Sequence, residues 1–263
     1  MPGFRSLSID YYFALDESRA IQSQHHSIYS YGQSMSNNQA YKPGFSFDRP
    51  WWSYVKVQKI IAAIKRNKRF LISKNISSKE YLDVGCGPNT HSDFISLDYG
   101  WNPKVDICWD ATRGLPFDDN SLTGIFTEHC LEHLDLESVN KVLFEFWRVL
   151  KPGGTVRLIV PDGELYLRNY VRIQDGDEGA HLPYSETDRF QDIYTPIMSI
   201  NRIFRGHGHQ FIFDYQTFER MLIKCRFANI KKESYKCGRD KNLLIDMESR
   251  VVESLYVEAS KPE

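Results

Sequence analysis

Apolar positions along the chain predict strands and helices in alternation from residue 79 onward. Short apolar runs of strand character are each followed by turn residues. The expected strands cover residues 80–84, 94–98, 105–108, 122–127 and 155–160. Between the last two, apolar residues recur at helical spacing from Val139 to Leu150, with Asp135 as the expected N-cap and Lys151-Pro-Gly-Gly as the expected end. This alternation indicates an open, mostly parallel α/β sheet.

Two further helices and two closing strands complete the expected elements. A helix is expected over residues 52–72, where isoleucines share one face and Lys or Arg cover much of the remainder. A second helix is expected over residues 214–226, and closing strands over residues 228–235 and 251–259. The shared face of the first helix consists of Ile60, Ile61 and Ile64, and the inward face of the second consists of Phe218, Leu222 and Cys225.

Two segments do not follow this alternation. Residues 1–50 have a polar centre, in which eleven of twenty consecutive residues are Ser, Gln or Asn, between flanks that carry aromatic residues. Such a segment is either an arm packed on the core or a lid that packs when ligand binds. Residues 163–213 lack a clean strand and, because they follow a sheet strand, are expected to contribute substrate contacts. We therefore expect an N-terminal arm and helix over residues 1–75 and a main domain over residues 76–263.

Composition and charge exclude several classes of protein. Of the 263 residues, 41% are hydrophobic and 25% are charged, enough for a sizeable core without disulfide or metal staples. The net charge of −1 argues against a protein built mainly to hold nucleic acid or an anionic membrane. No apolar run approaches the roughly 20 residues that span a bilayer, and the N-terminus lacks the apolar core of a signal peptide. We expect a cytoplasmic protein with no membrane partner.

The five cysteines are odd in number, and no pair has C-x-x-C spacing. Three of them lie in apolar or strand-like stretches, which is typical of reduced, buried thiols. Cys225, Cys237, His207 and His209 could be combined into a zinc site, but their spacing matches no familiar one. We therefore expect no metal.

The stretch Tyr81-Leu-Asp-Val-Gly-Cys-Gly-Pro-Asn contains the most informative loop. Gly85 and Gly87 follow an apolar strand and let the backbone turn sharply and approach a ligand closely, because no Cβ intervenes. A dinucleotide-binding loop would have a third glycine where this chain has Thr90. Pro88 also removes a backbone N–H that a pyrophosphate would use. A cofactor without phosphates fits this loop better than NAD.

Acidic residues follow the next two strands. Asp98 ends the second strand, where it can accept hydrogen bonds from the two hydroxyls of a ribose. Asp110 follows the third strand and can accept a hydrogen bond from an adenine amino group. Both positions indicate a nucleoside-containing cofactor.

With these motifs in order, the sequence resembles the class I S-adenosylmethionine-dependent methyltransferases, and within them a type 11-like compact subgroup. The resemblance covers roughly residues 79–162, and more loosely the chain to residue 259. The motifs that carry it, besides Asp98, are LDVGCGPN, DATRGLPFDD, IFTEHCLEHL and RVLKPGGTVRLIVPD. It implies a Rossmann-like, mostly parallel seven-stranded sheet with an antiparallel last strand, helices on both faces and an N-terminal extension.

The resemblance also implies roles for single residues. Gly85 and Gly87 would lie against the methionine moiety and ribose, and Asp83 would lie below the loop near the amino group. Asp98 would hold the ribose hydroxyls. The full set implied to bind S-adenosylmethionine is Asp83, Gly85, Cys86, Gly87, Asn89, Asp98, Asp110, Ala111, Glu128 and His129. Glu128 and His129, at the tip of the fourth strand, would face the methyl group and its acceptor.

One departure from the family concerns the first crossover. Only residues 88–93 lie between Gly87 and the second strand, whereas a parallel crossover usually needs a dozen or more residues. The first helix is therefore expected to be a turn or to be absent. Predicted methyltransferases with this compact N-terminal half often occur beside sugar or polysaccharide genes.

The expected function is methyl transfer from S-adenosylmethionine to a hydroxyl or amine of a small polar molecule, with a sugar or polysaccharide precursor as one candidate. A hydroxyl acceptor needs a base. His129 is the first candidate for this base, and Glu128 and His209 are further catalytic candidates, whereas His133 is expected to be structural.

Three alternatives stay open. A nucleic-acid amino methylase would carry an Asp/Asn-Pro-Pro-aromatic motif where this chain has Thr127-Glu-His-Cys. A non-catalytic cofactor-binding or interaction protein is compatible with the short crossover. A dinucleotide oxidoreductase is disfavoured by Thr90 and Pro88. The oligomeric state is not predicted.

Overall fold

The computed structural model describes residues 54–72, 76, 78–184 and 193–263, all within the unit Trp51–Glu263. The expected arm over residues 1–50 lies outside the described residues, so both of its interpretations and the division at residue 75 remain predictions. Among the described helices, none combines the length and apolar character that a membrane span needs.

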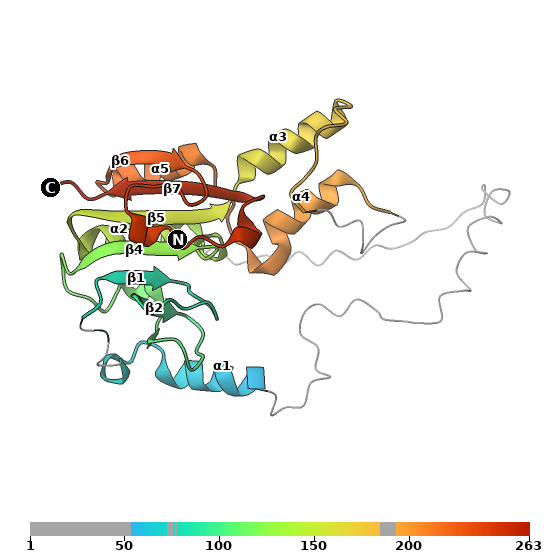
Figure 1. The fold of residues 1–263 in the computed structure, drawn as a ribbon. Helices are drawn as coiled ribbons and strands as arrows, with labels where there is room; N and C mark the ends of the chain where they lie inside the picture. Colours follow the sequence, from blue (N-terminus) through green and yellow to red (C-terminus); the bar gives the residue numbers. More distant parts are fainter. Residues whose placement is uncertain (1–53, 73–75, 77, 185–192) are drawn as a thin grey trace, which may run out of the picture. The chain divides into compact units, whose positions relative to one another are not determined.

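A seven-stranded sheet with the order β3-β2-β1-β4-β5-β7-β6 lies at the centre of this unit (Figure 1). Its strands are β1 (Tyr81–Val84), β2 (Phe94–Asp98), β3 (Ile107–Cys108), β4 (Leu122–Glu128), β5 (Leu150–Pro161), β6 (Ala228–Glu233) and β7 (Ser254–Ser260). The strands from β3 to β5 pair in parallel, and β7 runs antiparallel to both of its neighbours, β5 and β6. The expected Rossmann-like sheet with an antiparallel last strand is confirmed.

Five α-helices accompany the sheet in the described part of the chain. They are α1 (Tyr54–Lys65), α2 (Leu136–Val149), α3 (Gly163–Gln174), α4 (Pro196–Arg205) and α5 (Tyr215–Lys224). The expected N-cap of α2 is confirmed, because Asp135 Oδ1 accepts the backbone N–H of Ser138 at 2.8 Å. The expected end of α2 is wrong: the helix stops at Val149, and the chain enters β5 at once because Leu150 is extended and pairs with Leu122.

Helices α2 and α5 cover one face of the sheet. Side chains that alternate along the strands meet apolar residues of these two helices in one continuous core, as the period of two in a strand requires. Phe146 of α2 and Phe218 of α5 are completely buried in it. The inward orientation expected for Phe218, Leu222 and Cys225 is confirmed, because all three are completely buried.

The opposite face of the sheet is covered differently. Residues 85–93, all of them described, form turns without a helix, and β1 and β2 still pair in parallel. The expected loss of the first crossover helix is therefore confirmed. The apolar residues of this face pack instead against the segment between β6 and β7, residues 234–253. Their cluster consists of Phe94, Phe126, Ile159, Leu243 and Tyr256.

A buried arginine in the sheet forms an ion pair and hydrogen bonds with the segment 234–253. Arg157 of β5 is completely buried, and its guanidinium donates to both carboxylate oxygens of Asp246, at 2.7 and 2.6 Å, and to Glu258 Oε1 at 2.7 Å. Two backbone carbonyls of the segment, those of Ser234 and Cys237, accept further N–H groups of Arg157. Removing one partner of such a buried ion pair leaves an uncompensated charge, which costs about 3–5 kcal/mol.

Helix α1 differs from its expected form in length and orientation. It ends at Lys65 rather than at residue 72. The isoleucine face is not the buried one, because Ile60 and Ile64 are 61% and 64% exposed whereas Ala62 is 2% exposed. The small side chain of Ala62 lets the helix approach the sheet edge closely, where its carbonyl contacts the Cys108 thiol at 3.7 Å.

The segment 163–213 contains two helices that its polar sequence did not indicate. Helix α3 follows β5 directly, because Asp162 caps it by accepting the backbone N–H of Leu165 at 3.1 Å. Helix α4 packs against α3 through a small cluster that includes Tyr166, Ile200 and Ile203. Both helices lie at the end of the sheet toward which β5 points (Figure 1). The substrate contacts expected of this segment remain a prediction.

Candidate active site

A cavity of about 560 Å³ opens at the carboxyl ends of β1, β2 and β4. The strand order changes direction between β1 and β4, and ligands of open α/β sheets bind at such a point. We call this space the cofactor cavity. Five of the residues predicted to bind the cofactor line it: Gly85, Asp98, Asp110, Ala111 and His129.

Gly85, the first residue of the glycine loop, lines the cofactor cavity. Gly85 has a φ of +78° and its backbone N–H donates to Leu97 O at 2.8 Å, so the chain turns away from β1 while remaining bonded to β2. A Cβ at Gly85 would overlap with Cys130 Sγ, which packs directly against this glycine. Gly85 is therefore required both for its left-handed backbone and for the close approach of Cys130.

Asp98 connects the end of β2 to the glycine loop. Its Oδ2 accepts the backbone N–H of Gly87 at 2.9 Å, and its Oδ1 accepts that of Gly100 at 2.6 Å. A carboxylate has about four acceptor sites, so these two bonds leave sites for the hydroxyls of a ribose. Asp98 both shapes the loop and remains available to a ligand.

Asp110 organises the next part of the cavity wall. Its Oδ1 accepts the backbone N–H of Thr112 at 3.1 Å and the Thr112 hydroxyl at 2.6 Å, capping the short turn Ala111–Arg113. The indole N–H of Trp109 donates to Gly114 O at 2.6 Å, and the ring also lines the cavity. This arrangement provides an aromatic and polar wall of the kind that an adenine can pack against.

The other five predicted cofactor residues do not line this cavity, and their roles remain predictions. Asp83 is buried beneath the loop, where burial first, and then the neighbouring charges of Glu128 and Asp98, raise its pKa to about 8. Glu128 accepts the backbone N–H of Met247 at 3.2 Å, and burial raises its pKa. The five residues are Asp83, Cys86, Gly87, Asn89 and Glu128.

A second cavity, of about 510 Å³, lies beside α3 and α4. We call it the acceptor cavity. Its lining is mostly polar and includes Tyr166, Tyr184, Arg202, Arg250 and Glu253. The two cavities share two wall residues, His129 and His133.

His129 is held firmly where the two cavities meet. It has a φ of +49°, and its backbone N–H donates to Ile159 O at 2.9 Å. One ring nitrogen, Nε2, lies 2.9 Å from the Ser254 hydroxyl, and the other, Nδ1, lies 3.4 Å from Glu132 Oε1. The prediction that His129 lies at the fourth-strand tip is confirmed by the position of β4, and its chemical role remains a prediction.

The structure brings His209, one of the expected catalytic candidates, together with two residues that the sequence analysis did not assign to the site. Glu132 and His133 lie on the turn Leu131–His133, and His209 follows α4 and lines the acceptor cavity. Burial lowers the pKa of His133, which favours a neutral ring at neutral pH. The repeated Glu-His pairs of Glu128-His-Cys-Leu-Glu-His133 are the sequence signal that could have drawn attention to both.

Comparison with known proteins gives one match to a family and several to structures. Residues 92–158 match the family model of a methyltransferase domain. Among curated proteins, none matches this sequence. A crystal structure of an S-adenosylmethionine-dependent methyltransferase from Archaeoglobus fulgidus is similar at 16% identity, over 78% of this chain and 94% of that one, with a TM-score of 0.42.

A second similar structure is that of phosphoethanolamine N-methyltransferase 2 from Haemonchus contortus with S-adenosyl-L-methionine. It matches at 13% identity and a TM-score of 0.43, over 71% of this chain but only 49% of that one, so this chain spans about half of that protein. At such values, these structural similarities say nothing about substrate.

Proposed function

We propose that this protein is an S-adenosylmethionine-dependent methyltransferase that methylates an oxygen or nitrogen of a small polar acceptor. The main support for this proposal is that the cofactor cavity and the acceptor cavity share the wall residues His129 and His133. Transfer of a methyl group from a sulfonium is an in-line displacement, so the methyl carbon and the accepting atom must meet along one line. Two cavities that share wall residues would let a donor in one and an acceptor in the other meet in this way.

The donor is assigned to the cofactor cavity. Its methionine part would lie on Gly85, its ribose hydroxyls would bond to Asp98, and its adenine would lie near Asp110 and Trp109. All four residues line this cavity, whose volume of about 560 Å³ lies in the range typical of small-molecule sites. The sulfonium methyl would then point toward His129.

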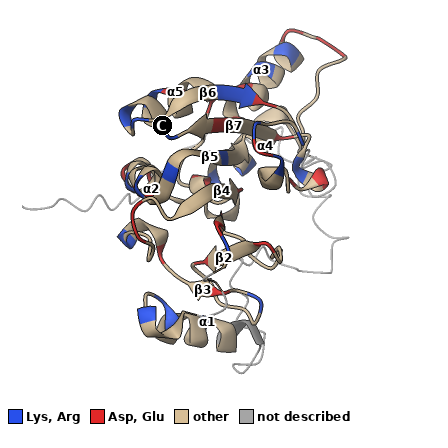
Figure 2. Cartoon of the chain, turned by 60° about the vertical axis from the view of Figure 1, so that its left-hand side comes forward, with Lys and Arg blue, Asp and Glu red and all other residues tan. Residues whose placement is uncertain are grey.

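The acceptor is assigned to the cavity beside α3 and α4, and its lining favours a polyhydroxylated molecule such as a sugar or a polysaccharide precursor. Tyrosines, arginines and two glutamates line it, and the polar groups of such residues bind hydroxyls by donating and accepting hydrogen bonds. In the view of Figure 2, basic and acidic residues are interspersed rather than gathered into one basic face. This distribution favours a small acceptor over a nucleic acid.

For a hydroxyl acceptor, His129 is the proposed base. Its Nδ1 lies 3.4 Å from Glu132 Oε1, and its Nε2 lies 2.9 Å from the Ser254 hydroxyl. The Ser254 hydroxyl donates to Arg250 O at 2.7 Å, so Nε2 is the donor in its contact with Ser254. To act as the base, the neutral ring would carry its proton on Nδ1, toward Glu132, and an acceptor hydroxyl would donate to Nε2. The acceptor's proton then passes to Nε2 while the oxygen–methyl bond forms and the sulfur–methyl bond breaks. The products are the methylated acceptor and S-adenosylhomocysteine.

Calorimetric titration with S-adenosylhomocysteine, with NAD as the control ligand, tests the donor site. Binding of the first alone supports the proposal, and binding of neither contradicts it. Methyl transfer is then measured with S-adenosylmethionine carrying a tritiated methyl group and a panel of acceptors that begins with sugars.

The variant His129→Asn tests the base. Asparagine tolerates the left-handed backbone at this position, so the fold is expected to persist. Methyl transfer to a hydroxyl should fall about 10²–10⁴-fold, the usual contribution of a general base. Because His129 also lines the cofactor cavity, the rate is measured at saturating S-adenosylmethionine, so that a change in donor affinity does not contribute. An unchanged rate would rule out His129 as the base.

A further inference from the structure

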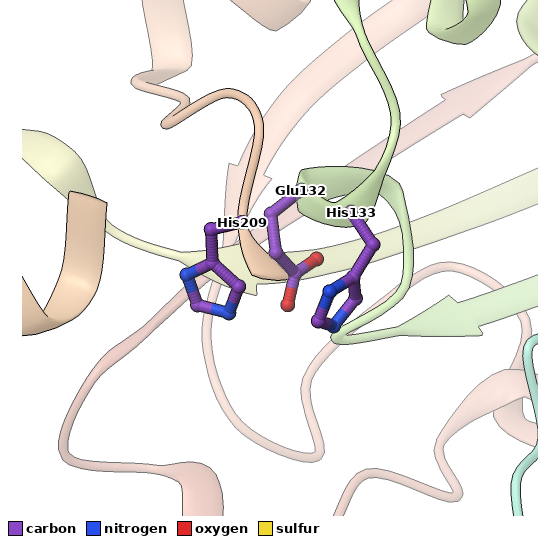
Figure 3. A group of neighbouring side chains, drawn as sticks. All are labelled: Glu132, His133 and His209. Atoms are coloured by element: carbon purple, nitrogen blue, oxygen red, sulfur yellow. The ribbon is translucent and has the colours of Figure 1, made fainter. Parts of the chain in front are cut away.

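Three side chains with metal-binding atoms meet on the wall of the acceptor cavity. The ligating atoms of Glu132, His133 and His209 all lie within 4.8 Å of one another. Figure 3 shows the Glu132 carboxylate between the two imidazole rings, with His209 entering from a different segment of the chain. The backbone N–H of Gln210 donates to Glu132 O at 2.7 Å, which ties the two segments together beside the cluster.

The carboxylate of Glu132 is incompletely satisfied. The residue is only 1% exposed, and its Oε1 lies 3.4 Å from His129 Nδ1. Its Oε2 is buried and has no hydrogen-bond partner among the described residues. Because a buried carboxylate oxygen without a partner carries a large desolvation cost, this atom indicates a missing positive group in the cluster.

His209 is oriented as metal-binding histidines usually are. Its Nδ1 lies 2.7 Å from the carbonyl oxygen of Ile203, to which it donates, so Nε2 carries the free electron pair. A bond from the second ring nitrogen to a backbone carbonyl is the common way to fix the tautomer of a metal ligand. The ring of His133 lies at 4.9 Å from that of His209, centroid to centroid, in an edge-to-face arrangement.

We propose that Glu132, His133 and His209 bind a divalent transition-metal ion at the wall of the acceptor cavity. Two imidazoles and one carboxylate suit Zn²⁺, Co²⁺ or Fe²⁺ better than Mg²⁺ or Ca²⁺, which prefer oxygen ligands. Ligands about 2.1 Å from one ion lie at most about 4.2 Å apart, so the observed set needs only a small inward rotation. Three protein ligands leave at least one position open for a further group.

This site deepens the proposed function and rests on it. His133 and His209 both line the acceptor cavity, so an acceptor oxygen can reach the open position of the ion. A bound cation polarises such an oxygen and lowers the pKa of its hydroxyl. Glu132 would then join the two parts of the site, with Oε2 on the ion and Oε1 beside the proposed base His129.

Metal titration of the full chain, stripped with a chelator, tests the site without reference to activity. Co²⁺ binding is followed by its visible absorption and Zn²⁺ binding by calorimetry. We expect one equivalent to bind, and we expect His209→Ala and Glu132→Gln each to weaken binding at least tenfold. His207→Asn is the matched control: His207 lines the same cavity but lies outside the cluster, and asparagine tolerates its φ of +56°. It should bind the metal as the natural protein does.

The same samples are titrated with S-adenosylhomocysteine, so that the two proposals are tested separately. Absence of metal binding in the natural protein, or equal binding in His209→Ala, overturns the metal site whatever the second titration gives. Metal binding that is lost in His209→Ala supports the metal site, whether or not the protein binds S-adenosylhomocysteine. Failure to bind S-adenosylhomocysteine would overturn only the proposed function. Because His209 is only partly buried, this variant should fold even where Glu132→Gln does not.

Discussion

Replacing Asp98 by alanine tests the assignment of the donor site directly. The carboxylate lines the cofactor cavity and also accepts the backbone N–H groups of Gly87 and Gly100, at 2.9 and 2.6 Å. Its removal should therefore have two separable effects, one on the stability of the fold and one on the affinity for the donor.

Both effects can be given a magnitude. A hydrogen bond to a charged group contributes about 1.5–3 kcal/mol. Asp98 is partly exposed, so water can replace it at the two N–H groups, and we expect the lower end for each bond. The free energy of unfolding should fall by about 3 kcal/mol. Loss of the bonds to the ribose hydroxyls should cost a further ~1–3 kcal/mol of binding, which is roughly a 5–150-fold weaker affinity for S-adenosylhomocysteine.

Asp106 provides the matched control. Its Oδ2 accepts the backbone N–H of Ser96 at 2.9 Å and lies 3.6 Å from Lys79 Nζ, but it does not line the cofactor cavity. Urea denaturation should show a loss of stability in both Asp98→Ala and Asp106→Ala. Calorimetry should show a loss of affinity in Asp98→Ala alone. Affinity within twofold of the natural protein in Asp98→Ala, or an equal loss in both variants, would refute the assignment.

Three further predictions concern stability. The pKa of Asp83 is about 8 in the folded protein and about 3.9 in the unfolded chain, so the stability that its protonated form contributes is fully present below pH 4 and is lost as the pH rises through 8. Asp83→Asn should therefore have a higher melting temperature than the natural protein at pH 8–9. A difference in melting temperature that does not shrink toward pH 5 would contradict this. Asp246→Asn should lower the free energy of unfolding by about 3 kcal/mol because it breaks the buried pair with Arg157, and a change below 1 kcal/mol in urea denaturation would contradict this. Gly85→Ala should destabilise by more than about 1 kcal/mol, from its positive φ and from overlap with Cys130, and an unchanged melting temperature would show that the loop can adapt.

Local patterns predicted most of the fold. The alternation of buried residues, the capping residue Asp135 and the glycine turn after β1 depend on neighbours close in the chain, so they were visible in the sequence. The spacing between Gly87 and Phe94 was also sufficient to predict that a crossover helix is missing. The orientation of α1 was not predictable in this way, because Ala62 was buried by its fit to the sheet edge rather than by its hydrophobicity.

The cover of the second sheet face and the composition of the site were decided only by the tertiary structure. A sequence that lacks a crossover helix does not say what replaces it; here Arg157 and Asp246, far apart in the chain, bind the segment 234–253 over that face. In the same way, His209 joins Glu132 only because α3 and α4 return the chain to the end of β4. Secondary structure follows from interactions between near neighbours, whereas a cavity is formed by side chains whose distance in the sequence is unrelated to their distance in space.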